Sequence, residues 1–565
     1  MDDEERLKLT EKRLKNLSRS GNSLFQLAVR LTVKNIRYFI DQQNKKLLNL
    51  PGFARETIML ELTRLKCSKV DGDLEIFEFL LRAFKLLLSP QTKRIELNGL
   101  MTFCPEFLKT NKVTEILQLI VVHAPNVQSL IINEKLRLCS SEERNEAATK
   151  KMCLAIGKLT KLIHLQLEMY QIYYTDVELI CRKLRKLEYL IVRIIPEFDL
   201  RIENVEKFKS SFCRLKVFVF GDPRINRSML TQLCLLHLPN LEILQNYADD
   251  SKIGHYDFAP NLTAELQQVV RPALRHLSTD CPCPLKLHEV FPNVSHLRIK
   301  MNFRLDRVCD VDPFMHFTKI KSLALIDLPL NKTEELLKKY GKNLTSLRIR
   351  HFFEDACSYS FKRIFELCPK LELLGLDGVQ MSDDNESITS FAELKHFEWS
   401  VMFTDLLAHK QFHLSNILKA PKLEAFSLYS REQFRASDLK MLLVLICNKQ
   451  ILGNLQYLLL DVCPVSRMHN DINDPCFKIF STLLKNASAF LPKLVDLDVF
   501  LKIYGAQEVP SEKRCKYVME HPSSAFCSED MAANLGWLGE ANLIKFLHAF
   551  KVDVTDSHDQ GLKTQ

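Results

Sequence analysis

Few residues of this 565-residue chain combine the types and spacing that catalysis or metal binding requires. His288 and Glu289, in the stretch HEVFP, begin like the helical His-Glu-x-x-His motif that binds zinc. Pro292 stands where the second histidine is needed, and proline would break the helix, so we expect a loop. Asp383 and Asp384 are adjacent carboxylates between Ser and Asn, a context typical of a solvated turn rather than of a catalytic pair.

The sequence also lacks the short motifs that carry nucleophilic or phosphate chemistry. It contains no G-x-S-x-G, no glycine-rich phosphate loop and no G-x-G-x-x-G. The 17 cysteines are scattered singly, and the closest pair is Cys281 and Cys283 in CPCP. An odd number of isolated cysteines favours buried thiols in a reducing compartment over a disulfide framework or a zinc site. We therefore predict no catalytic residue, no metal and no cofactor.

The pattern that dominates the sequence is a repeat. CPKLELLGLDG at 368–378 returns as LPNLEIL at 238–244, FPNVSHLRI at 291–299, APKLEAFSL at 420–428 and LPKLVDLDV at 491–499. Its skeleton is φ-x-x-φ-x-φ, where φ is apolar, and it recurs about every 28 residues. The fourteen copies begin at Val127, Leu162, Leu187, Leu215, Leu241, Leu274, Val294, Ile320, Leu344, Leu371, Leu394, Leu423, Leu455 and Leu494.

Each copy predicts a short strand followed by a return helix. Leu374 and Leu376 alternate, so they share one face of a strand. The run TEELLKKYGKNL at 333–344 has helical spacing, and Gly341 is expected to end that helix. Proline before the strand, as at Pro369, sets an extended entry. One repeat cannot bury its own apolar face, so neighbouring repeats must stack.

These repeats resemble leucine-rich-repeat proteins over residues 95–505. The resemblance implies an α/β solenoid with parallel strands on the concave face and helices on the convex face. Extracellular members usually place Asn three residues after the last apolar strand position. In this chain one repeat has an asparagine at that position, Asn302, whereas other repeats have Tyr170, Ile195, Met402 and Lys502. The chain is therefore more similar to the helix-backed intracellular members.

A solenoid of this kind offers its strand face for binding. The exposed strand positions change from basic to acidic along the chain, which would suit an extended peptide with an acidic and then a basic stretch. Alternatively, exposed strand positions simply need polar residues, since Ile191, Val219, Ala324 and Leu459 occupy equivalent places without visible order. The candidate substrate-binding residues are Arg298, Lys300, Arg348, Arg350, Asp377 and Glu398, continued by Asp461 and Asp498.

Before the repeats, residues 23–90 show helical periodicity in SLFQLAVRLTVKNIRYFI, LPGFARETIMLELTRL and LEIFEFLLRAFKLLL. The first helix is expected to be amphipathic, with a stripe through Leu24, Leu27 and Leu31 that continues to Asn35 and Tyr38. One interpretation is a cap that shields the first repeat from solvent.

A second interpretation rests on the order of an amphipathic helix, a spacer, an LP step and then repeats. This order resembles the elongin-binding box and cullin box of leucine-rich-repeat substrate receptors of cullin–RING ubiquitin ligases, the ZYG and ZER families among them. The resemblance implies elongin B/C and a cullin as partners, although Ala28 and Thr32 depart from the box. The alternative is an F-box that starts at Leu50-Pro51 and holds a Skp adaptor through Ile58, Leu60 and Leu62. The implied adaptor-binding residues are Ser23, Leu24, Leu27, Ala28, Leu31, Leu50 and Pro51.

The ends and the overall charge complete the prediction. We expect a flexible N-terminus at 1–22, a C-terminal helical cap at 506–552 that includes NLGWLGEANLIKFLHAF, and a disordered tail at 553–565. The start lacks a secretory signal and no apolar run could span a membrane, which favours the cytoplasm or nucleus. The net charge of +9 is small for a nucleic-acid-binding chain of this length. The sequence therefore predicts a non-catalytic protein-binding solenoid that recruits a protein substrate to a ligase, with a plain interaction scaffold as the alternative.

Overall fold

The computed structural model describes residues 24–41, 47–63, 65, 72–132, 146–195, 205–221, 227–246, 270–281, 286–301, 310–351, 358–382, 391–401, 413–430, 435–462, 479, 482, 483, 491 and 496–501. Within them, fifteen parallel strands form one sheet whose order follows the chain. The strands are β1 (Arg94–Glu96), β2 (Ser129–Ile131), β3 (His164–Tyr173), β4 (Tyr189–Ile195), β5 (Val217–Gly221), β6 (Ile243–Asn246), β7 (His276–Cys281), β8 (His296–Met301), β9 (Ser322–Ile326), β10 (Ser346–Arg350), β12 (Leu373–Asp377), β14 (His396–Val401), β15 (Ala425–Ser430), β16 (Tyr457–Val462) and β17 (Asp496–Leu501). A separate pair is formed by β11 (Ser358–Tyr359) and β13 (Gln380–Met381). The α/β leucine-rich-repeat solenoid predicted from the sequence is confirmed.

Every one of the fourteen repeat copies becomes a strand, and each strand begins two residues after the first apolar position of its copy. Among the strands of the large sheet, the sequence pattern missed only β1, because Thr92 stands where the other repeats have an apolar residue. Thr92 is nevertheless fully buried. Its hydroxyl accepts a hydrogen bond from the Ser89 backbone N–H at 3.1 Å, which satisfies the polar group inside the core.

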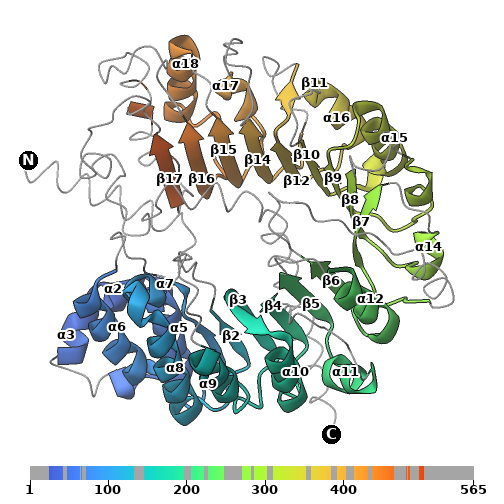
Figure 1. Cartoon of the computed structure of the whole chain (residues 1–565). Helices are drawn as coiled ribbons and strands as arrows, with labels where there is room; N and C mark the ends of the chain where they lie inside the picture. Colours follow the sequence, from blue (N-terminus) through green and yellow to red (C-terminus); the bar gives the residue numbers. More distant parts are fainter. Residues whose placement is uncertain are drawn as a thin grey trace, which may run out of the picture.

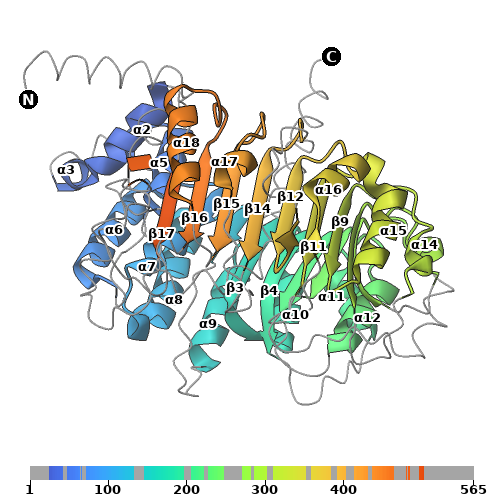
Figure 2. The same cartoon turned by 90° about the horizontal axis from the view of Figure 1, so that it is seen from above.

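Helices return the chain from most strands to the next, and Figure 1 shows them on the outside of an arc whose inside is lined by the strands. Figure 2 shows the strands running side by side along that inner surface. We call the sheet face that is turned away from the helices the inner face. The return helices are α7 (Asn98–Thr102), α8 (Glu106–His123), α9 (Glu146–Ile156), α10 (Tyr174–Lys183), α11 (Val205–Phe212), α12 (Arg227–His237), α14 (Leu287–Val290), η1 (Asp312–Phe314), α15 (Leu330–Tyr340), η2 (Gly341–Asn343), α16 (Phe361–Leu367), α17 (Leu414–Ile417) and α18 (Ala436–Cys447).

The core lies between the sheet and the helices, and the apolar residues of the repeat build it. Leu371, Leu374 and Leu376 are 0–1% exposed, and the matching residues of neighbouring repeats stack on them in register. Removing one such leucine side chain would cost about 2–5 kcal/mol, because the cavity left behind cannot close. The repeat therefore recurs because each copy covers the copy before it.

Asparagines join several turns at the edge where the strands begin. Four of them, one residue before a repeat start, donate from their side-chain amide to a carbonyl oxygen in the preceding turn. The donor and acceptor atoms are 2.7–3.3 Å apart, and the donors are Asn126, Asn240, Asn293 and Asn454. This bond fixes the stacking of consecutive turns without help from the core.

The N-terminal helices form a module at the start of the sheet. They are α2 (Leu24–Lys34), α3 (Ile36–Asp41), α5 (Gly52–Thr63) and α6 (Leu74–Leu87), so the first predicted helix is broken at Asn35. One carboxylate oxygen of Glu56 in α5 accepts hydrogen bonds from the backbone N–H groups of Arg94 (2.8 Å) and Lys93 (3.3 Å). The module therefore caps the exposed edge of β1, which would otherwise be open to pairing with another chain.

One local prediction is wrong, the helix end at Gly341 is confirmed, and other predictions lie outside the described residues. The HEVFP stretch was predicted to be a loop, but His288 and Glu289 lie in the one-turn helix α14, which ends before Pro292. Gly341 does follow α15, yet its backbone stays right-handed at φ −53°. Glycine is needed there because a Cβ would lie 2.3 Å from the carbonyl oxygen of Leu367. Asp383, Asp384 and the predicted segments 1–22, 506–552 and 553–565 lie outside the described residues.

Candidate binding surfaces

The predicted substrate-binding residues do lie on the inner face of the sheet. Along β10, Leu347 and Ile349 are buried toward the helices, whereas Arg348 and Arg350 alternate with them and are partly exposed on the other side. Arg298 and Lys300 hold the same positions on β8. This alternation follows from the period of two residues in a strand.

Arg348 and Glu398 form an ion pair that crosses an intervening strand. The Arg348 Nη2 and Glu398 Oε2 atoms are 3.2 Å apart, although β12 lies between β10 and β14. The β12 residue in register with both is Gly375, and a Cβ there would lie 3.1 Å from Arg348 Nε. The missing side chain therefore leaves the channel through which Arg348 reaches its partner.

A second ion pair lies beside the first. Arg350 Nε is 2.8 Å from Asp377 Oδ2, and these residues face each other directly on β10 and β12. Burial raises the pKa of Glu398 to about 7, and burial likewise lowers the pKa of the Arg348 guanidinium. We call these four residues the charge cluster.

The charge cluster changes the predicted layout of charge. A basic stretch followed by an acidic stretch was expected, but at β10–β14 the two signs are interleaved and neutralise one another. Arg298 and Lys300 lie on β8, which precedes β10 by two strands in the sheet (Figure 1). The side chains of Asp461 and Asp498 lie outside the described residues. Whether any of these residues binds a substrate remains a prediction.

Apolar side chains gather on the inner face of the early strands. Ile191 of β4 is in register with Val219 of β5, and Tyr189 is in register with Val217 and then Ile243. Ile191 and Val219 show no visible order in the sequence, because only the strand register brings them together. We call these five residues the inner apolar patch; they are 0–7% exposed, with Ile163 packed against them.

Two histidines lie between the inner apolar patch and the charge cluster. His276 of β7 and His296 of β8 are in register, with ring centroids 6.1 Å apart and nearly parallel planes. Burial, with smaller contributions from neighbouring His296 and Arg298, lowers the pKa of His276 to about 3. Both imidazoles are therefore neutral at pH 7.

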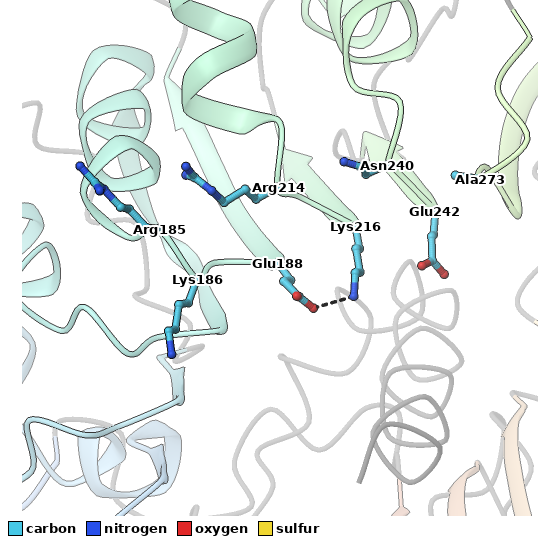
Figure 3. Close-up of a pocket in the computed structure, with 8 residues that line it drawn as sticks. All are labelled: Arg185, Lys186, Glu188, Arg214, Lys216, Asn240, Glu242 and Ala273. Atoms are coloured by element: carbon cyan, nitrogen blue, oxygen red, sulfur yellow. Dashed lines mark ion pairs between the residues drawn. The ribbon is translucent and has the colours of Figure 1, made fainter. Parts of the chain in front are cut away.

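A cavity of about 400 Å³ opens where β4, β5 and β6 begin. Figure 3 shows Arg185 and Arg214 extending in the same direction from neighbouring turns, while Lys216 turns toward Glu188. The Lys216 Nζ and Glu188 Oε2 atoms are 3.0 Å apart. The other residues that line the cavity are Lys186, Asn240, Glu242 and Ala273. Burial raises the pKa of the Glu242 carboxyl group. No sequence motif reveals this site, because its residues come from four separate turns.

The N-terminal module presents a different kind of surface. Leu24 and Leu31 of α2 are 84% and 60% exposed, and Phe53 of α5 is 66% exposed. The centroids of the Phe25 and Phe53 rings lie 5.7 Å apart. Of the other residues implied by the adaptor resemblance, Ala28 and Pro51 are exposed, Leu27 and Leu50 are half-buried, and Ser23 lies outside the described residues.

Nothing in the described part of the chain is arranged for metal chemistry. Within the described ranges, no three His, Cys, Asp or Glu side chains are grouped so that they could hold a metal ion. His288 instead packs its ring 4.9 Å from His316. No described helix is long and apolar enough to cross a membrane.

Comparison with known proteins adds little to this geometry. No known protein family and no curated protein matches the chain. Among solved structures, an internalin (inlF) from Listeria monocytogenes matches over 66% of this chain and 92% of its own, at 14% identity and a TM-score of 0.30. The structure of TLR13 in complex with ssRNA13 matches over 66% of this chain at 16% identity and a TM-score of 0.29, and this chain covers 47% of it. The leucine-rich-repeat architecture therefore rests on the repeats and the sheet of this chain itself.

Proposed function

We propose that this chain is a non-catalytic protein-binding subunit of a cullin–RING ubiquitin ligase. The N-terminal module docks on the adaptor elongin B/C and a cullin, and the inner face of the solenoid holds the protein substrate. The ubiquitin-transfer chemistry belongs to the partners. A leucine-rich-repeat arc suits such a role because its inner face is a continuous surface built on a rigid core.

The observation that carries this proposal is that α2 has two apolar stripes. Val29, Val33 and Ile36, which follows at the start of α3, are buried against the rest of the module. Leu24 and Leu31 lie seven residues apart on another face and are largely exposed. A helix that only capped the first repeat would need one apolar stripe, so the second is free to enter a groove on a partner.

The F-box alternative is less well supported by the burial of its key residues. Ile58 and Leu62, which that interpretation would use to hold a Skp adaptor, are 3% and 1% exposed in the module's own core. They are therefore not available to a partner, whereas Leu24 and Leu31 are.

A plain interaction scaffold is supported by one specific observation, the capping of β1 by Glu56. Capping and docking use different residues, so the two roles are compatible.

A nucleic-acid-binding solenoid receives less support. Arg348 and Arg350 each form an ion pair with a carboxylate, so they are not available to bind phosphate.

The proposal is tested by direct binding of the purified full chain to purified elongin B–C, with a Skp adaptor in a parallel titration. We expect a stable complex with elongin B–C and none with Skp. Binding to Skp alone would transfer the proposal to the F-box class. Binding to neither adaptor would leave the scaffold interpretation.

A further inference from the structure

The inner apolar patch needs a cover, and we infer that the C-terminal segment 526–559 of this same chain provides it. The occupant is therefore intramolecular, held by apolar contacts with β4–β6 and by the basic turns at their starts. This inference does not rest on adaptor docking, because it concerns the inner face of β4–β6 and not the exposed stripe of α2.

The side chains of the inner apolar patch are almost completely buried. Ile191, Val217 and Val219 are 0%, 2% and 3% exposed. Side chains on the helix-covered face of the same strands, such as Leu190 and Phe218, are equally buried for an evident reason, because they belong to the main core. The patch forms a separate cluster on the other side of the sheet.

No described element lies over that side of the sheet. Figure 1 shows α10, α11 and α12 on the outside of β4–β6, and no labelled helix on the inside. Exposing five such side chains to water would cost on the order of 10 kcal/mol, at about 1.5–3 kcal/mol for each. The cover must therefore come from residues outside the described ranges or from another molecule.

The turns beside the patch favour an acidic occupant. Three consecutive turns carry a cation at the position where other repeats place the turn-joining asparagine, namely Lys161, Lys186 and Arg214. Arg185 stands next to Lys186, and both lie in the same cavity lining as Arg214. Among the described residues, no ion pair involves Arg185, Lys186 or Arg214.

Like charges on neighbouring strands are unfavourable at a spacing of about 4.8 Å. Lys216 is neutralised by Glu188, and Arg275 lies 3.7 Å from Glu242, so these two carboxylates do not offset the three cations. The surface thus combines an apolar centre with a basic rim, which suits an apolar segment flanked by carboxylates.

Segment 526–559 has this composition. Apolar residues cluster in NLGWLGEANLIKFLHAF, which contains Trp537, Phe546 and Phe550. Six carboxylates accompany only two lysines over the whole segment. The carboxylates stand on both sides of the apolar centre as well as within it: Glu529, Asp530, Glu540, Asp553, Asp556 and Asp559.

The connection to the segment is long enough. The 24 residues 502–525 separate the end of β17 from Phe526, and a chain of that length can extend to about 80 Å. The path along the sheet from β17 back to β4 crosses eleven strand spacings, or about 53 Å. A direct path across the arc is shorter still.

The consequence is a solenoid that occupies part of its own binding face. Residues 526–559 would compete with any partner for the inner apolar patch, so partner binding would require their displacement. A truncated chain would bind that partner more tightly by the factor that displacement costs.

The experiment replaces Tyr189 with photoreactive benzoyl-phenylalanine in the otherwise intact full chain and identifies the crosslinked peptide by mass spectrometry. Tyr457 occupies the same strand position on β16 and is 48% exposed, so it serves as the matched control site. We expect intramolecular crosslinks from position 189 to peptides within 526–559, at several-fold higher yield than from position 457.

The charged rim is tested in the same assay. The double variant Arg185→Glu/Arg214→Glu changes exposed side chains and should lower the crosslink yield from position 189 at least fivefold at low salt. The control Lys342→Glu/Lys370→Glu reverses two exposed cations on later turns and should leave the yield unchanged. Retained cooperative thermal unfolding shows that each variant is folded.

Three outcomes would overturn the inference. Crosslinks from position 189 to the 247–269 connection would assign the cover to that segment, and crosslinks between two copies would make it intermolecular. Equal yields from the two double variants would remove the role of the basic rim. All measurements use the purified chain without adaptors, so their outcome is independent of the elongin titration.

Discussion

Arg348 on β10 pairs with Glu398 on β14 across the strand between them, and Gly375 on that strand leaves the space. The two charged residues are 50 positions apart in sequence. Their side chains are only 12% and 17% exposed, so the pair is partly removed from water. Breaking such a pair is costly because it leaves each charge buried without its partner.

Gly375→Val should therefore destabilise the protein. The new side chain would occupy the channel of Arg348, since a Cβ already lies 3.1 Å from Nε. We expect a loss of about 1–3 kcal/mol of unfolding free energy, the cost of stranding a half-buried ion pair, measured by urea denaturation. Ala324→Val is the matched control, because Ala324 is in register with Arg348 on its other side, on β9. An equal loss in both variants would mean that the channel has no special role.

The His276–His296 pair makes a prediction about pH. The pKa of His276 is lowered to about 3 in the folded chain by burial, and by His296 and Arg298 nearby. Burial lowers the pKa of His296 as well, with smaller contributions from Lys321 and Arg275. The unfolded state takes up a proton near pH 6.5 while the folded state does not. Stability is therefore complete above pH 6.5 and falls as the pH decreases toward 3.

Between pH 7 and pH 5 the wild type should lose about 2 kcal/mol more than His276→Gln, at about 1.4 kcal/mol for each pH unit below 6.5. Urea titrations of both proteins at the two pH values measure the difference, in which other titrating groups cancel. The exposed His316→Gln variant is the control and should follow the wild type. Parallel pH profiles for wild type and His276→Gln would contradict the account of this pair.

Glu56 makes a prediction about the edge of the sheet. Its carboxylate accepts two backbone hydrogen bonds from β1, so Glu56→Ala should cost about 1–3 kcal/mol, the range for hydrogen bonds to a charged group. Glu115→Ala on α8 removes an ion pair of 3.0 Å with Lys112, and the Glu115 side chain is half exposed. Such surface pairs contribute about 0–1 kcal/mol. Thermal unfolding of both variants tests the difference, and equally small shifts would show that α5 does not depend on Glu56 to hold the edge.

Asn240 makes a prediction about the turn edge. Its amide donates to the carbonyl oxygen of Cys213 at 3.1 Å, so Asn240→Ala should lower the unfolding free energy by about 0.5–1.5 kcal/mol. Lys370→Ala at the equivalent turn position should be neutral, because exposed Lys370 makes no such bond among the described residues. Chemical denaturation distinguishes the two, and a neutral Asn240→Ala would show that the core alone sets the stacking of the turns.

The sequence predicted the architecture well because the repeat encodes local and nearest-neighbour physics. The alternation of Leu374 and Leu376 defines a strand face, and fourteen copies repeat it. The pattern failed at Thr92, where a hydroxyl bonded to Ser89 replaces an apolar side chain. Composition alone could not reveal that substitution, because it depends on a hydrogen-bond partner inside the core.

The binding surfaces were predicted less completely, because they depend on register between strands far apart in sequence. Alternation correctly assigned Arg348 and Glu398 to the inner face, but not to each other. Likewise, Ile191 and Val219 meet only because β4 and β5 pair with a 28-residue offset. On α2, periodicity identified the stripe through Leu24 and Leu31, but not that a second stripe at Val29 and Val33 does the packing.

The central claim is that the exposed stripe of α2 is a docking surface rather than part of the cap. Isothermal titration of elongin B–C into wild type, Leu24→Ala/Leu31→Ala and the control Phe107→Ala/Val122→Ala tests it most directly. Phe107 and Val122 are comparably exposed apolar residues on α8, at 81% and 70%. We predict that the α2 variant binds at least about tenfold more weakly, because each leucine buried in an interface contributes about 1.5–3 kcal/mol, while the α8 variant binds like the wild type. Equal affinity of all three proteins for elongin B–C would contradict the claim.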